Sequence, residues 1–163
     1  MLGTTLYPLN ELKYIYPDLY STTIEKYRGR EELLEREVKN LNCRWNDVLH
    51  LTAVPPEKIK ESLLRAGVNY NESSWFKIPV EILAKEKITV FTYNIAKSDV
   101  YDVLEYETFD LIRMPVYQTI PNETIEYYKE DLSLGKDPLT FHLIPHILYK
   151  GTLDVSRIEI ITI

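Results

Sequence analysis

The sequence predicts a single-domain α+β protein spanning residues 1–163, with a mostly antiparallel sheet and helices concentrated in the N-terminal third. Three observations predict this fold. The length is typical of one domain and suffices to bury roughly 70% of the surface that the unfolded chain exposes. Helical spacing of apolar residues is frequent early in the chain, and short β-prone segments dominate later. Helices and strands that are segregated in this way favour α+β over a doubly wound parallel sheet.

The N-terminal segment, residues 9–39, has helical spacing in two or three pieces. Asn10 can cap the first piece, and Pro17 interrupts it because the residue before a proline is pushed out of the α region. Gly29 offers a stop for the second piece. A third helix is predicted from Arg30 onward, in REELLEREVK. Its charges nearly cancel, which favours a solvated helix face; the alternative is a docking surface.

The central segment has the clearest strand-to-helix pattern. Residues 48–52 are predicted to form a strand, after which Pro55 and Pro56 start a helix that ends at Gly67. The buried residues predicted for this helix are Ile59, Leu63 and Leu64. The other predicted elements are strands at 75–79, 88–93, 141–149 and 157–163, a helical turn at 79–83, strand and loop at 97–118, and a helix at 122–128.

Composition and charge exclude several classes of function. The net charge of −6 argues against general binding of nucleic-acid backbones, although a small basic pocket stays open. Cys43 is the single cysteine, so neither an intramolecular disulfide nor a multi-cysteine zinc site can form. We expect a cytoplasmic protein without membrane contact, because no secretion signal and no apolar run of about 20 residues is recognisable. None of the five glycines falls into a phosphate-loop or dinucleotide-loop pattern.

The three histidines, His50, His142 and His146, are the first candidates for chemistry. The last two have the i, i+4 spacing of paired helical metal ligands, but Pro145 disfavours a helix there. In a strand their side chains would lie roughly 13 Å apart, too far to share one ion. No metal site is therefore predicted at this pair. A site formed by His50, a later histidine and an acid stays open, as does a purely structural role for each ring.

The segment NDVLHLTAVPPEKIKESL carries a His-x-Thr triplet at His50 and Thr52. An imidazole can exchange a proton near neutral pH, and a hydroxyl two residues on points to the same side of a strand. The segment resembles the first motif of the two-histidine phosphoesterase superfamily, and IPHILYKG resembles the second, with Leu148 where that family has a hydroxyl residue. The resemblance implies that His50, Thr52 and His146 are catalytic residues of a phosphodiesterase-like hydrolase.

A second resemblance covers LHLTAVPPEKIKESLLRAG and HILYKGTLDVSRIEIITI at the C-terminus. Both segments are similar to the first and last parts of small ADP-ribosyltransferase-like proteins. That family implies contact between the His-x-Thr strand and NAD, and it implies a glutamate where this chain has Pro145 and His146. A degenerate member that binds NAD or another nucleotide without transfer is therefore the alternative, and otherwise no cofactor is predicted. The residues up to about 45 would be an addition to that core.

Three further residues are predicted to bind the substrate: Trp45, Arg44 and Lys150, which lie near the two histidine motifs in sequence. The function predicted from these residues is that of a nucleotide- or phosphoester-handling protein with a histidine-containing pocket. The alternative is a non-catalytic interaction protein, in the form of a homodimer for example. Its basis is the high number of tyrosines, 13, which serve protein interfaces and core edges equally well.

Overall fold

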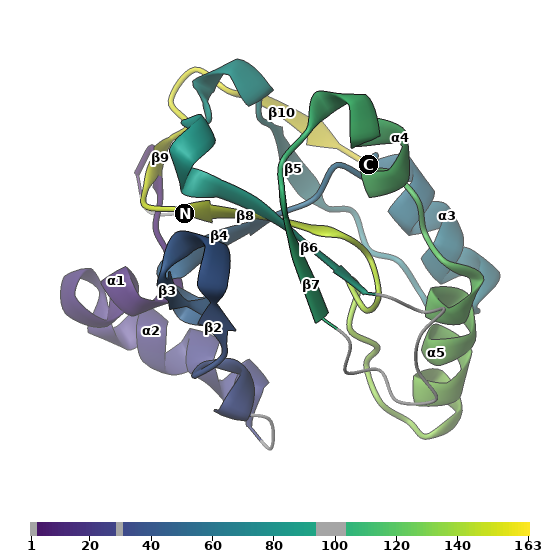
Figure 1. Ribbon diagram of the computed structural model, residues 1–163. Helices are drawn as coiled ribbons and strands as arrows, with labels where there is room; N and C mark the ends of the chain where they lie inside the picture. The colour runs from purple at the N-terminus through teal and green to yellow at the C-terminus, as the bar shows by residue number, and fades with distance from the viewer. Residues whose placement is uncertain (1–2, 29–30, 94–103) are drawn as a thin grey trace.

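The computed structural model describes residues 3–28, 31–93 and 104–163. At its centre lies a four-stranded antiparallel sheet (Figure 1). The strands, in their order across the sheet, are β4 (Val48–Leu51), β8 (His146–Lys150), β6 (Ile88–Tyr93) and β7 (Leu104–Thr108). The β-prone ITVFTY segment thus forms an inner strand with the predicted bounds, and most of its residues are buried.

The remaining described strands form three antiparallel pairs. These are β1 (Thr5–Leu6) with β9 (Leu153–Asp154), β2 (Glu37–Val38) with β3 (Cys43–Arg44), and β5 (Ser74–Lys77) with β10 (Glu159–Thr162). Helices and antiparallel sheets therefore occur together, as the predicted α+β class requires. The predicted strand at 141–149 begins only at His146, because residues 141–144 form turns in which Leu143 has a φ of 59°.

The predicted concentration of helices in the N-terminal third is wrong. The α-helices are α1 (Leu9–Ile15), α2 (Pro17–Ile24), α3 (Pro56–Arg65), α4 (Met114–Tyr117) and α5 (Asn122–Ser133). Figure 1 shows α1 and α2 on one side of the molecule and α3, α4 and α5 on the other, with the sheet between them. The late helix α5 forms because its apolar stripe packs against α3, so tertiary burial, more than local propensity, places the helices.

The third predicted N-terminal helix is also absent from the described residues. The segment holds a single 3-10 turn, Glu31–Leu33, and then strand β2. Val38 is fully buried and pairs with Cys43 in a hairpin, so burial in the sheet layer overrides the helical spacing of the segment. Arg30 and Gly29, at the expected start of that helix, lie outside the described residues, as do positions 97–103 of the predicted strand-and-loop segment.

Short 3-10 turns connect many of the elements. Those within the described residues are Glu25–Tyr27, Glu31–Leu33, Lys39–Leu41, Trp45–Asp47, Val80–Ile82, Lys85–Lys87 and Leu111–Arg113. The turn at Val80–Ile82 matches the helical turn that the sequence predicts at 79–83. Among the described helices, none combines the length and the apolar character that a bilayer crossing requires.

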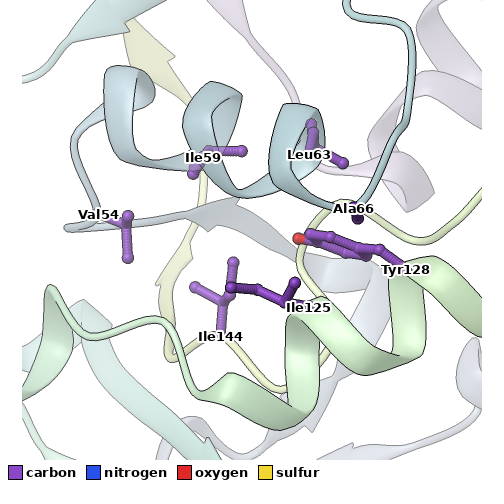
Figure 2. Close-up of a cluster of buried hydrophobic side chains, with 7 residues drawn as sticks. All are labelled: Val54, Ile59, Leu63, Ala66, Ile125, Tyr128 and Ile144. Atoms are coloured by element: carbon purple, nitrogen blue, oxygen red, sulfur yellow. The ribbon is translucent and has the colours of Figure 1, made fainter.

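A hydrophobic cluster joins α3 to α5. Figure 2 shows Ile59 and Leu63 of α3 facing Ile125 and Tyr128 of α5. The cluster consists of Val54, Ile59, Leu63, Ala66, Ile125, Tyr128 and Ile144, and we call it the α3–α5 cluster. Of the predicted stripe, Ile59 and Leu63 are buried, whereas Leu64 is 52% exposed and faces outward. The sheet itself has one cluster of buried residues around Phe91 and Leu148 on one face and another around Ile147 and Tyr149 on the opposite face.

Candidate functional site

The register of β4 against β8 places the predicted histidines at one end of the central sheet. His50 lies opposite Leu148, and Leu51 lies opposite Ile147. The same register carried one residue further would set Thr52, just beyond the end of β4, opposite His146. Because side chains alternate along a strand, the two histidines and Thr52 belong to the same face of the sheet. The structure thus brings His50 and His146 together, and the alternation along the chain puts Thr52 on the same face.

The two imidazole rings face each other closely. Their centroids are 6.1 Å apart and their planes are perpendicular, at 90°. Each ring is held by a backbone carbonyl: His50 Nε2 donates to the oxygen of Trp45 at 2.9 Å, and His146 Nδ1 donates to that of Ile144 at 2.7 Å. Since a carbonyl oxygen can only accept, each bond fixes which ring nitrogen carries the proton. In neutral His146 the lone pair therefore lies on Nε2.

His146 is the more enclosed ring of the pair, being half-buried where His50 is exposed. Burial lowers the pKa of His146 to about 3, and the neighbouring His50 and Arg36 lower it further against the opposing effect of the Ile144 carbonyl. His146 is consequently uncharged at neutral pH. Because Nδ1 donates to the Ile144 carbonyl, Nε2 is the acceptor of the neutral ring. This nitrogen can accept a hydrogen bond from a ligand.

Aromatic rings surround His146. The ring centroids closest to it belong to Trp45 at 5.6 Å, Phe91 at 5.8 Å, Phe141 at 6.1 Å and Tyr93 at 6.4 Å. Trp45 also lies 4.5 Å from the His50 ring, so its predicted proximity to the histidines is observed. However, Trp45 is only 7% exposed. It packs against both imidazoles and presents little surface to a ligand.

The two cations predicted to bind substrate have other partners. Arg44 is exposed and pairs with Glu35 at 2.7 Å. Lys150 donates from Nζ to the carbonyl oxygen of Leu41 at 2.9 Å, and it lies four residues along β8 from His146, roughly 13 Å away. Neither cation is therefore brought to the imidazole pair.

The cation that lies beside the histidine pair is Arg36, which is not among the site residues predicted from the sequence. Its guanidinium lies 5.3 Å from the Trp45 ring centroid and 5.7 Å from that of Phe91. No local signal pointed to it, because it sits in a run of balanced charges that reads as a solvated helix. The hairpin of β2 and β3 folds it over the sheet, where the backbone oxygen of Arg36 accepts from Trp45 N at 2.8 Å.

A cavity of about 620 Å³ begins beside His50 and Thr52. This volume lies within the range of roughly 300–1,000 Å³ that is typical of small-molecule sites. Four aromatic rings, Trp75, Phe76, Phe109 and Phe141, belong to its lining, together with the amide of Gln118. Phe141 links the cavity to the histidines, since its ring centroid lies 6.0 Å from that of Trp75 and 6.1 Å from that of His146. A smaller cavity of about 210 Å³ lies along Leu49–Leu51 toward α1 and α2.

Thr52 and His142 have local structural partners. Thr52 Oγ1 accepts from the Val54 N–H at 3.1 Å and so shapes the turn that leads into α3. His142 stacks on Tyr127 of α5 with ring centroids 3.7 Å apart, which separates its role from that of the other two histidines. Within the described parts of the chain, no group of three potential ligands could hold a metal ion.

The tyrosines are mostly packed. Tyr117 and Tyr128 are fully buried, and Tyr93 and Tyr106 are half-buried beside Phe91. Tyr14, at 80% exposure, is the one described tyrosine that projects into solvent. Most of the other described tyrosines are half-buried, a degree of exposure that suits core edges and a protein interface equally well.

Comparisons with known proteins assign no family to the chain. No family model matches it, and no curated protein or solved structure matches it either. The two resemblances carried by the His-x-Thr segment therefore stay hypotheses. The function has to be argued from the residues of the site: two imidazoles with fixed protons, a guanidinium on aromatic rings and an aromatic-lined cavity.

Proposed function

We propose that this protein binds a nucleotide at the end of the sheet where β4 meets β8. In this proposal the base occupies the 620 Å³ cavity and the ribose lies at its mouth, against His50 and His146. One observation carries the proposal: His50 is both a member of the imidazole pair and a wall of an aromatic-lined cavity of ligand size. A concave apolar site with a few convergent polar groups is the usual form of a small-molecule site.

The lining of the cavity suits a planar heterocycle. Trp75 and Phe141, whose rings meet edge to face at 6.0 Å, offer aromatic surface for stacking. Stacking of a base on an aromatic side chain contributes about 1–3 kcal/mol. Gln118 adds an amide that can both donate to and accept from the edge of a base. A purely aliphatic ligand would leave this amide unsatisfied, so the lining favours a base over a lipid chain.

His50 lines the cavity and His146 lies beside it, outside the lining, so a ribose placed next to His50 is the part of a nucleotide that could reach both rings. Neutral His146 presents Nε2 as an acceptor, which is complementary to a hydroxyl donor and offers no charge to a phosphate. His50, the exposed ring, lies 6.1 Å from it, so one sugar can meet both imidazoles. A pKa of about 3 keeps His146 neutral at neutral pH, so this ring cannot serve as the general acid of a hydrolysis. Leu148 is fully buried and supplies no hydroxyl. We therefore propose binding, with turnover left outside the proposal.

Calorimetric titration with NAD, a cyclic nucleotide and the four nucleoside 5′-monophosphates tests this function. His146→Phe replaces the imidazole by an aromatic ring of similar size that has no Nε2 acceptor, and we expect it to weaken nucleotide binding roughly tenfold or more. His50→Ala should weaken binding as well, while the melting temperature stays close to that of the wild type. The matched control is His142→Ala, which removes the histidine that stacks on Tyr127 and should leave affinity unchanged. Wild-type affinity in both site variants, or no binding of any of these nucleotides, would refute the proposal.

A further inference from the structure

Arg36 is a half-buried cation that stands on two aromatic rings. Its guanidinium carbon lies 5.3 Å from the ring centroid of Trp45 and 5.7 Å from that of Phe91. These are the same two rings that flank His146. A cation over a ring face gains about 0.5–2 kcal/mol, depending on how far it is removed from water. The rings therefore hold the guanidinium beside the imidazole pair, but they replace only part of its hydration.

Arg36 differs from the other described arginines in being half-buried without an acidic partner among the described residues. Arg28, Arg44 and Arg113 each form an ion pair with a glutamate. The arginines that form no such pair elsewhere, Arg65 and Arg157, are exposed to solvent. Within the described part of the chain, the guanidinium of Arg36 has neither an ion pair nor a hydrogen bond. Its five N–H donors, arranged as a planar fork, stay available.

The hydroxyl group of Tyr93 belongs to the same region of the structure as Arg36. The Tyr93 ring lies 4.9 Å from the Phe91 ring, over which the guanidinium of Arg36 stands at 5.7 Å. Burial raises the pKa of Tyr93 to about 12, and the charge of Arg36 opposes this rise. The Tyr93 hydroxyl has no hydrogen-bond partner among the described residues, whereas that of Tyr106 already donates to the carbonyl oxygen of Glu37 at 2.9 Å. At neutral pH Tyr93 keeps its proton, so its O–H adds another donor beside the guanidinium.

We infer that Arg36 and the Tyr93 hydroxyl form a binding site for a phosphate group, next to the histidine pair and on the same face of the sheet. A guanidinium fork matches two phosphate oxygens at once, and a neutral phenol can donate to a third. The inference rests on the proposed function, because it assigns the phosphate of the nucleotide to a residue pair beyond the sugar. The cavity would then bind the base, His146 the sugar and Arg36 the phosphate.

The test compares a nucleoside 5′-monophosphate with the matching nucleoside by calorimetry. In the wild type we expect the monophosphate to bind roughly tenfold to a hundredfold more tightly, as a charge-assisted contact allows. Arg36→Gln should bring the two affinities together without weakening the nucleoside, and Tyr93→Phe should reduce the difference severalfold. The matched control, Arg44→Gln, removes an arginine of the same hairpin that is paired with Glu35, and it should leave the difference intact.

Inorganic phosphate provides a second arm that does not depend on the base or the sugar. A phosphate bound at Arg36 brings negative charge near His146 and should raise the pKa of that ring, as followed by the NMR shift of its Cε1 proton. The rise should be absent in Arg36→Gln and smaller in Arg36→Lys, which keeps the charge and loses the fork. If phosphate acts in this way but nucleosides do not bind, the phosphate site stands and the proposed function falls. If Arg36→Gln keeps the monophosphate advantage or the phosphate-induced rise, the site is refuted.

Discussion

The α3–α5 cluster and the histidine end of the sheet both contain aromatic rings, but they differ in whether their polar groups have hydrogen-bond or ion-pair partners within the protein. In and beside the α3–α5 cluster, the hydroxyl of Tyr128 donates to the carbonyl oxygen of Thr140, and that of Thr124 donates to His142 O at 3.0 Å. At the histidine end, the guanidinium of Arg36 has no acidic partner among the described residues, and His146 keeps an open Nε2.

This difference indicates that the α3–α5 cluster contributes mainly to stability and the histidine end mainly to binding. A buried polar group that lacks a partner costs about 1–3 kcal/mol, so a region that serves only packing satisfies its donors and acceptors internally. A binding region leaves them for the ligand. Apolar substitutions should therefore act on folding in the α3–α5 cluster, and polar substitutions at the histidine end should act on binding and on pH dependence.

The largest effect is expected in the α3–α5 cluster. Ile59 has no exposed surface, so Ile59→Ala leaves a cavity and should lower the free energy of unfolding by about 3 kcal/mol. Leu64, on the same helix, is 52% exposed, and Leu64→Ala should cost less than about 1 kcal/mol. Urea unfolding followed by circular dichroism measures both. Equal losses in the two variants would mean that α3 does not bury the face shown in Figure 2.

A second prediction concerns pH at the histidine end. Burial holds the pKa of His146 at about 3, below the ordinary value of about 6.5, so the unfolded chain takes up a proton first as the pH falls. The contribution is fully present above pH 6.5 and decreases below it. Between pH 7.5 and pH 5 it should lower the free energy of unfolding by about 2 kcal/mol.

His146→Phe isolates this contribution, because it keeps a ring of similar size but cannot be protonated. Denaturant unfolding of the variant at both pH values should show a pH dependence that is about 2 kcal/mol smaller than in the wild type. The pKa of His142 is also lowered by burial, so the wild type and His146→Phe share that part of the pH dependence. If the change in the free energy of unfolding between the two pH values is the same in the variant and the wild type, His146 is solvated in the folded protein and its pKa is not lowered.

The two regions also differ in how far the sequence could predict them. Strand β4, helix α3 and the bounds of β6 follow from local patterns, namely alternation, a proline start and a glycine stop. The same patterns placed His50 on a strand, and the register of β8 then brought His146 to it. Local patterns alone do not pair His50 with His146, because strands nearly 100 residues apart meet only through the tertiary fold; that pairing was predicted from the resemblance to a family with two histidine motifs.

Arg36 shows the limit most clearly. The run REELLEREVK has helical spacing and balanced charge, so each of its arginines reads as solvated. Only the pairing of Val38 with Cys43 turns the segment into a hairpin and lays Arg36 on Trp45. Arg44 and Lys150 were chosen for their closeness in sequence to the histidines. Strand geometry separates Lys150 from His146, and Arg44 turns outward to Glu35.

The smallest expected effect is that of Lys150→Met, which tests whether Lys150 has a structural role or binds the ligand. Its Nζ donates to the carbonyl oxygen of Leu41, a buried residue, so Lys150→Met should cost about 1 kcal/mol of stability and leave nucleotide affinity within about twofold of the wild type. Lys129→Met is the control, because Lys129 pairs with Glu126 on the surface and its loss should cost less than about 0.5 kcal/mol. Thermal melts and calorimetric titration of the same samples give both quantities. A large loss of affinity with unchanged stability would assign Lys150 to the ligand and extend the site along β8. The expected result confines the site to the end of the sheet that holds His50, His146 and Arg36.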